Sequence, residues 1–149
     1  MNWNKDKSLL LSRIAVIFFA LLLLALDLFC IRLSVFFIGI RQMPKQDVTY
    51  LALTLYLCSV PGWLCLFSLW QLLGSICRGE VFTGENVRRM RHVSWCCAAA
   101  SLITLISSLY YLPFIIAAAA MAFMALIVRI VKNAFDQALS MKSELDLTI

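Results

Sequence analysis

The sequence RGEVFTGENVRRMRH, residues 78–92, is a polar island in the middle of an otherwise apolar chain. It contains four arginines and two glutamates, and long apolar runs lie on both sides of it. Placing this many charged side chains in hydrocarbon costs too much free energy. This stretch must therefore leave the membrane. We therefore predict a turn at a membrane surface, between two helices that span the membrane.

The same stretch contains signals for the start of a helix. Gly79 gives the backbone the freedom that a turn needs, and Thr83 is a candidate N-cap with Asn86 three residues later. That spacing resembles a capping box, in which glutamate or glutamine is the usual partner. We predict a helix that starts near Glu85 and meets no breaker before Pro113.

The composition places the chain among membrane proteins. Of its 149 residues, 63% are hydrophobic and only 14% are charged, whereas soluble domains are about one quarter charged. The length allows about four spans of ~20 residues and little else. The basic residues behind the net charge of +5 flank the apolar runs, which indicates membrane orientation and no direct binding of nucleic acid. The predicted fold class is an all-α, integral membrane four-helix bundle in a single domain.

The predicted spans follow from the charge-free stretches. The 37 residues between Arg91 and Arg129 contain no Asp, Glu, Lys or Arg, which is too long for one span and sufficient for two. Pro113 marks the reversal between them. We predict four spans, at residues 9–31, 48–76, 93–111 and 114–131. Residues 132–149 then form a cytoplasmic tail.

The distribution of lysine and arginine predicts the orientation. If both termini lie on one side, ten of the thirteen basic residues share that side and three lie on the other. The positive-inside rule then places both termini in the cytoplasm of a cell-membrane protein. Arg88, Arg89 and Arg91 are interpreted first as topology determinants, while contacts with anionic lipid and docking of a cytoplasmic protein remain alternatives.

Asp27 is an acidic residue inside an apolar run, which by default makes it a candidate functional residue. It lies roughly 27 Å into the first span, near the predicted outer interface, so we expect a structural pair with Arg32 or Arg41. Pro61-Gly62 predicts a kink in the second span, for which a packing role is favoured. A small transporter or channel component that uses Asp27 and this kink is the alternative function.

The cysteines and the single histidine give a third alternative, a metal or redox membrane protein. His92 and Cys96 share a helical face, as do Cys58 and Cys65, but paired CxxC or HxxxH motifs are missing. We therefore predict no metal and no cofactor. The chain also has no phosphate-binding loop and no assembled nucleophilic triad, so we predict that it is not an enzyme.

The chain end has two signals. Residues 132–143 have a helix-forming composition, whereas Leu145–Ile149 alternates apolar and polar residues like a strand. We favour a tail that folds back on the central turn, with Asp146 or Glu144 pairing with its arginines. The alternative is a tail that binds a partner, either as an added strand or through its terminal carboxylate.

Two segments together resemble a bacterial membrane family catalogued as domain of unknown function 2975. GEVFTGENVRRMRHVSW, residues 79–95, is similar to its signature G-x-x-F-[ST]-x-x-N-[VI], and FDQALSMKSELDLTI, residues 135–149, is similar to its tail. Leu145 departs from that tail, where asparagine is usual. The positions that match the family's motifs are Gly79, Phe82, Thr83, Asn86, Arg91, Glu144, Asp146, Leu147 and Thr148.

The resemblance covers nearly the whole chain and implies four spans without an established activity. Members of the family often resemble proteins whose genes lie beside the gene of a small helix-turn-helix regulator. Our leading hypothesis is therefore a regulatory or scaffolding partner of a cytoplasmic protein such as a transcription regulator, and a homo-oligomer remains open. Arg88, Arg89 and Ile149 join the matching positions as candidate partner-binding or structural residues.

Overall fold

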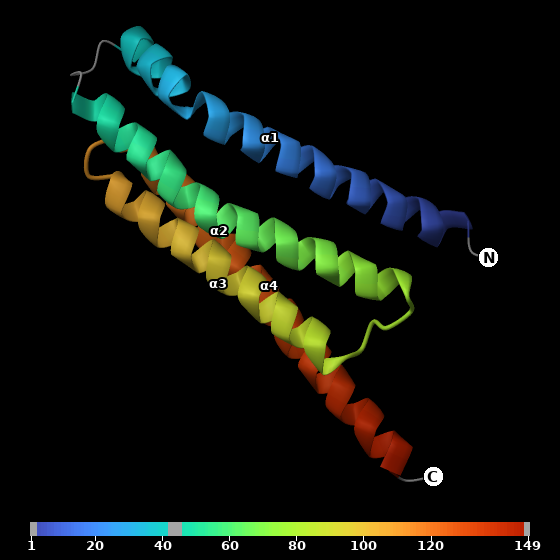
Figure 1. Cartoon of the computed structure of the whole chain (residues 1–149). Helices are drawn as coiled ribbons and strands as arrows, with labels where there is room; N and C mark the ends of the chain where they lie inside the picture. Colours follow the sequence, from blue (N-terminus) through green and yellow to red (C-terminus); the bar gives the residue numbers. More distant parts are fainter. Residues whose placement is uncertain (1–2, 42–45, 148–149) are drawn as a thin grey trace.

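The computed structural model describes residues 3–41 and 46–147, and side chains within 7–40 and 47–145. These residues form four helices and no strand, which confirms the predicted all-α fold class. The helices are α1 (Trp3–Arg41), α2 (Gln46–Cys77), α3 (Gly84–Ser107) and α4 (Phe114–Leu147). Successive helices run in opposite directions, so the start of α1, the turn between α2 and α3, and the end of α4 share one end of the molecule (Figure 1). We call this the turn end.

Three of the four helices are long and apolar enough to cross a membrane. Their stretches are Lys7–Ile40, Asp47–Cys77 and Phe114–Leu145. Large apolar side chains on them point outward, for example Leu28 at 73% exposure and Ile116 at 75%. Apolar surface on this scale is what the hydrocarbon of a bilayer covers. The chain therefore has the exterior of a membrane protein.

The third helix differs from its prediction. It ends at Ser107, so a span to residue 111 and a helix without a break before Pro113 are both wrong at their C-terminal ends. The hydroxyls of Ser107 and Ser108 donate to carbonyls in the preceding turn, at 2.9 and 2.6 Å, and compete with continuation of the helix. Helix α3 is not among the helices that satisfy the length and hydropathy of a span, so its crossing stays a prediction.

The helices pack in the order of the chain. Helix α1 packs on α2, α2 on α3 and α3 on α4, and no other pair of the described helices comes close. Between α3 and α4, the Ser94 hydroxyl donates to the Ala125 carbonyl at 3.0 Å, and the Ser101 hydroxyl donates to the Ala118 carbonyl at 2.8 Å. Both alanines are buried. The small alanines of α4 thus allow the two helices to approach closely.

Hydroxyl groups also join α3 to α2. The Thr54 hydroxyl of α2 lies 2.8 Å from the Ser107 hydroxyl and 2.9 Å from that of Tyr110. Among the described side chains, every buried nitrogen and oxygen has a hydrogen-bond partner. Small and hydroxyl-bearing residues therefore fill the contacts between helices, while large apolar residues face outward.

The Pro61-Gly62 pair lies inside α2, which continues through it. Gly62 faces α1: a Cβ atom there would lie 3.2 Å from the Leu23 Cδ2 atom, tighter than ordinary contact. Glycine therefore lets α1 approach α2, in line with the predicted packing role. Helix α1 is also longer than the predicted first span, because residues 33–40 continue it as helix.

The predicted orientation leads to a direct test. In a variant without native cysteines, a membrane-impermeant maleimide added to intact cells should label Gln46→Cys and leave Gly84→Cys unlabelled. The two positions start α2 and α3, at opposite ends of the molecule (Figure 1). After permeabilisation both should react, which controls for local accessibility. Labelling of Gly84→Cys alone on intact cells would invert the orientation.

Candidate functional site

The turn between α2 and α3 begins with a fixed helix end. Gly79 has φ 80°, its N–H donates to the Ile76 carbonyl at 3.0 Å, and the next N–H, of Glu80, donates to the Ser75 carbonyl at 3.1 Å. These two bonds form a Schellman motif, in which a residue in the left-handed region ends a helix. Glycine suits this φ because it has no Cβ atom. The direction in which the chain leaves α2 is therefore determined by backbone geometry.

The predicted N-cap of α3 is confirmed, but the predicted capping box is not. Thr83 is extended, and its hydroxyl accepts from the Asn86 N–H at 3.4 Å. The Asn86 side chain does not return a bond to Thr83. Its amide nitrogen instead donates to the carbonyls of Glu80 and Val81, at 2.7 and 3.1 Å. The asparagine side chain is shorter than the glutamate or glutamine of a capping box. Here it binds carbonyls of the turn and not the backbone of the N-cap residue Thr83.

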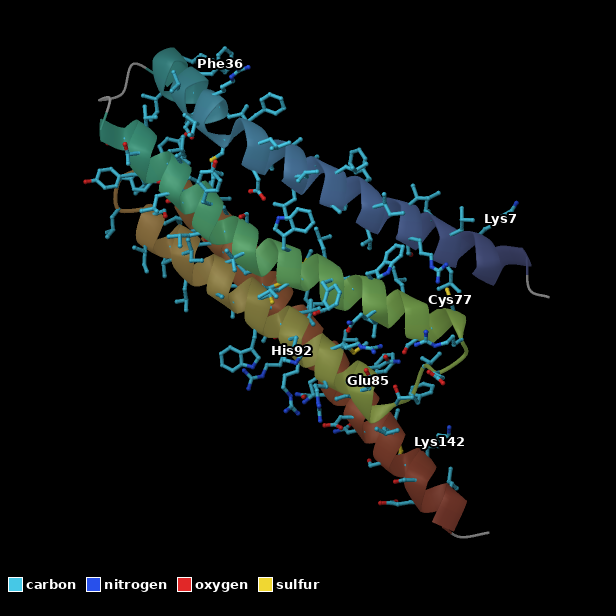
Figure 2. The ribbon with its side chains drawn as sticks, viewed as in Figure 1. Lys7, Phe36, Cys77, Glu85, His92 and Lys142 are labelled. Atoms are coloured by element: carbon cyan, nitrogen blue, oxygen red, sulfur yellow. The ribbon has the colours of Figure 1, made fainter. Side chains whose placement is uncertain are left out.

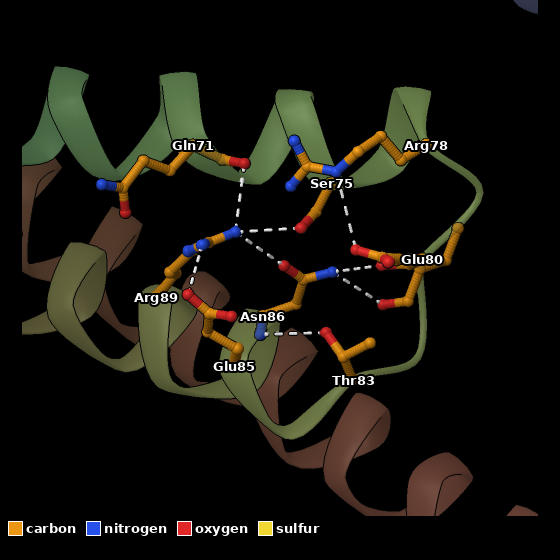
Figure 3. Close-up of polar contacts among 9 residues, drawn as sticks. Gln71, Ser75, Arg78, Glu80, Thr83, Glu85, Asn86 and Arg89 are labelled. Atoms are coloured by element: carbon orange, nitrogen blue, oxygen red, sulfur yellow. Dashed lines mark hydrogen bonds and ion pairs between the residues drawn. The ribbon is translucent and has the colours of Figure 1, made fainter.

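A half-buried guanidinium, that of Arg89, links the turn to α2. The Nη1 of Arg89 donates to the Gln71 carbonyl at 3.1 Å and to the Ser75 hydroxyl at 3.0 Å, both on α2 (Figure 3). It also donates to Asn86 Oδ1 at 3.3 Å, and Nη2 pairs with the Glu85 carboxylate. Only 14% of the Arg89 side chain is exposed. Arg89 therefore has a structural role and does not offer its charge to lipid or to a partner.

An aromatic contact joins the turn to α4. The rings of Phe82 and Phe135 are stacked, with centroids 5.4 Å apart and an interplanar angle of 30°. Such a pair contributes about 0.5–1.5 kcal/mol beyond the burial of its area. The turn is thus connected to α2, α3 and α4, and we call residues 75–89 the cap.

The predicted extended tail is wrong as far as Leu147, because α4 continues as helix to that residue. No glycine or proline follows Pro113, so nothing interrupts the helix. A continuous helix does not fold back, and the end of α4 projects beyond the cap, with Lys142 near its tip (Figures 1 and 2). Thr148 and Ile149, and the side chains of Asp146 and Leu147, lie outside the described residues.

The other cations of the central stretch face outward. Arg88, Arg91 and His92 are exposed on α3, and Arg88 and Arg91 form no ion pair with a carboxylate in the described part of the chain. His92 lies along α3, about two turns beyond Glu85 (Figure 2). Of the three arginines that the sequence grouped together, Arg89 therefore belongs to the hydrogen-bond network, whereas Arg88 and Arg91 are exposed.

Asp27 is not where the sequence placed it. Helix α1 continues for 14 residues beyond it, roughly 21 Å, so it is not near the outer end of the helix. The Trp63 indole N–H of α2 donates to its Oδ2 at 2.9 Å, and the Tyr56 hydroxyl donates to its backbone carbonyl at 3.2 Å. No ion pair of Asp27 is present among the described side chains, which include Arg32. The tryptophan bond favours a structural role, joining α1 to α2.

The cysteines do not form a metal cluster in the described residues, where no three His, Cys, Asp or Glu side chains converge. Cys65 of α2 lies near Cys97 of α3, whereas the sequence placed it on one helical face with Cys58. Helix α3 lies directly beside α2 at this point, which the spacing within one helix does not reveal. Two thiols without a further ligand do not support the metal alternative.

Several residues at the turn end have roles that sequence reasoning missed. Ser75 gave no signal, because a lone serine in an apolar run is common in membrane helices. Arg129 and Lys132 were used only to assign orientation, yet they line a groove together with Arg91. A signal for this was present: Arg91 and Arg129 bracket the charge-free stretch of two antiparallel helices, so they must meet at the same end.

Comparison with known families gives a match over nearly the whole chain. Residues 8–149 match a family described as a protein of unknown function, DUF2975, as the two sequence motifs indicated. No curated protein and no solved structure matches the chain. The match covers the four helices, but it brings no established activity with it.

The cap network predicts a ranking of stability. Asn86→Ala removes the side-chain donor of two turn carbonyls and one of the acceptors of the Arg89 guanidinium, so it should cost about 2 kcal/mol. Thr83→Ala removes only the N-cap bond and should cost about 1 kcal/mol. Thermal unfolding in detergent measures both. Asn133→Ala, on the exposed surface of α4, is the matched control, and a loss at Asn86 no larger than at Asn133 would contradict the network.

The Asp27–Trp63 bond predicts coupling between α1 and α2. In a double-mutant cycle of Asp27→Leu and Trp63→Phe, the Trp63→Phe change should cost about 0.5–1.5 kcal/mol more in the wild type than in Asp27→Leu. The readout is again unfolding in detergent. Independent, additive effects would show that the indole does not depend on the carboxylate.

Proposed function

This chain belongs to the DUF2975 family of proteins of unknown function, and from that premise we propose that it is a membrane-embedded docking protein for a cytoplasmic partner. The observation that supports this proposal most is the cap, in which Asn86 and Arg89 fix a surface turn to its flanking helices. A turn that only connects two spans does not need an arginine that is hydrogen-bonded to both flanking helices. A binding surface does need supports of this kind, because preorganised sites lose less entropy on binding.

The surface that the cap supports has two parts. Arg88 is exposed next to the network residue Arg89, so the network fixes the backbone from which Arg88 points outward. Beyond Phe135, which stacks on Phe82 of the turn, α4 continues for 12 residues, roughly 18 Å, with Met141 58% exposed. A partner that covers the apolar side chains of this projecting end would stabilise the complex by burying them.

The partner follows from this chemistry and from the predicted orientation. An apolar groove would accept the projecting end of α4, and carboxylates at the rim of that groove would face Arg88. The excess of lysine and arginine at the turn end supports a cytoplasmic location for this surface. By analogy with the family, a helix-turn-helix transcription regulator is the partner that we propose first.

Photocrosslinking in living cells tests the proposal. A benzoylphenylalanine placed at Arg88 or at Met141 should give the same discrete protein adduct, since both positions belong to one surface. The same probe at Leu109, which is 89% exposed at the opposite end, is the matched control and should not give that adduct. Mass spectrometry of the adduct identifies the partner.

A charge reversal makes the test specific. Arg88→Glu should lower the crosslinking yield from Met141 several-fold, because reversal of a rim charge slows association. Arg32→Glu, the same reversal at an exposed position of α1 away from the turn end, serves as the comparison and should not lower it. If the adducts at Arg88 and Met141 contain only this chain, or if Leu109 gives them equally, the docking function is wrong.

A further inference from the structure

A groove between α3 and α4 at the turn end is separate from the cap. It has a volume of about 460 Å³, and three cationic side chains line one part of it: Arg91 of α3 with Arg129 and Lys132 of α4. The remaining wall is mostly apolar and includes Trp95, Ala98, Ala122 and Leu126. The groove thus combines a basic end with an apolar extension.

The charges in the groove are largely uncompensated. No acidic side chain lines it, and neither Arg91 nor Arg129 forms an ion pair with a carboxylate among the described residues. Lys132 has one such neighbour, Asp136, at 3.7 Å in the next turn of the same helix. Three cations around one space repel one another, and an anion placed between them would interact favourably with all three.

The position of the groove identifies the kind of anion. Arg91 and Arg129 are the last and first basic residues around the charge-free stretch, so their charges lie where the apolar part of the helices begins. Ala98 and Ala122 lie seven residues further along their helices, roughly 10 Å deeper. Trp95 stands between the two levels, as tryptophans do at the interface of a bilayer.

We propose that this groove binds an anionic phospholipid. Its phosphate occupies the space between Arg91, Arg129 and Lys132, and an acyl chain lies on the wall of Ala98, Ala122 and Leu126. Basic pockets between membrane helices recognise headgroups by this chemistry. A free phosphate ion would leave the apolar wall without a ligand, and an acidic peptide would have to enter the hydrocarbon to reach it. The proposal does not depend on the docking function.

The test uses the full chain, purified in a nonionic detergent and stripped of lipid. Native mass spectrometry should show one phosphatidylglycerol molecule bound at concentrations where phosphatidylcholine does not bind. Arg91→Gln and Arg129→Gln should each weaken this binding about tenfold, because each removes a charge-assisted bond to phosphate. Arg88→Gln removes the same charge one turn earlier, outside the groove, and should leave the affinity within about twofold.

Two further measurements separate the lipid from its parts. Ala122→Leu narrows the apolar wall at an exposed position without a change of charge, and it should also weaken phosphatidylglycerol binding several-fold. Inorganic phosphate and glycerophosphoglycerol should not displace the lipid at millimolar concentration. Equal binding of phosphatidylcholine, equal loss in Arg88→Gln and Arg91→Gln, or displacement by phosphate would each overturn the proposal, the last in favour of a simple anion site.

Discussion

The hydrogen bond from the Ser101 hydroxyl of α3 to the Ala118 carbonyl of α4 requires two helix backbones to lie very close together. In hydrocarbon, apolar side chains gain little by leaving lipid, so helices associate through such close contacts. The same bond recurs between Ser94 and Ala125, seven residues along in opposite directions, which defines an antiparallel register. On the other side of α3, Thr54 of α2 meets further hydroxyls. Helix α3 can therefore be less apolar than α2 and α4. These two helices flank it and shield its polar side chains from lipid.

The same helix organises the turn end. Its first turn is attached to α2 through Arg89, while Phe82, just before it, reaches α4. Two residues further along α3, Arg91 faces the groove beside α4. The proposed docking surface and the proposed lipid site therefore depend on a single rigid segment. A lipid in the groove would contact α3 and α4 where the docking surface begins, so it would support the base of the projecting helix.

Part of this arrangement could be read from the sequence, and the rest depends on contacts between distant residues. The positions of the charges and the lengths of the apolar runs were sufficient to predict four helices and the surface turn. Local rules for helix ends were sufficient to predict the Thr83 N-cap. The partner of Asp27 was not accessible, because it is an uncharged indole 36 residues away and only opposite charges were considered. The tail was misread because five alternating residues cannot outweigh continuation of an existing helix, where each added residue gains a backbone bond.

The arginines at positions 88, 89 and 91 show why a charge run cannot be given a single role. On a helix of 3.6 residues per turn, each residue is rotated by about 100°, so Arg89 and Arg91 lie about 160° apart with Arg88 between them. Helix α3 has α2 on one side and α4 on the other. Arg89 consequently meets the Ser75 hydroxyl of α2, Arg91 lines the groove of α4, and Arg88 is left to the outside. One basic segment thereby holds the turn through Arg89, lines the groove that we propose for an anionic headgroup through Arg91, and exposes Arg88, the charge that we propose for docking.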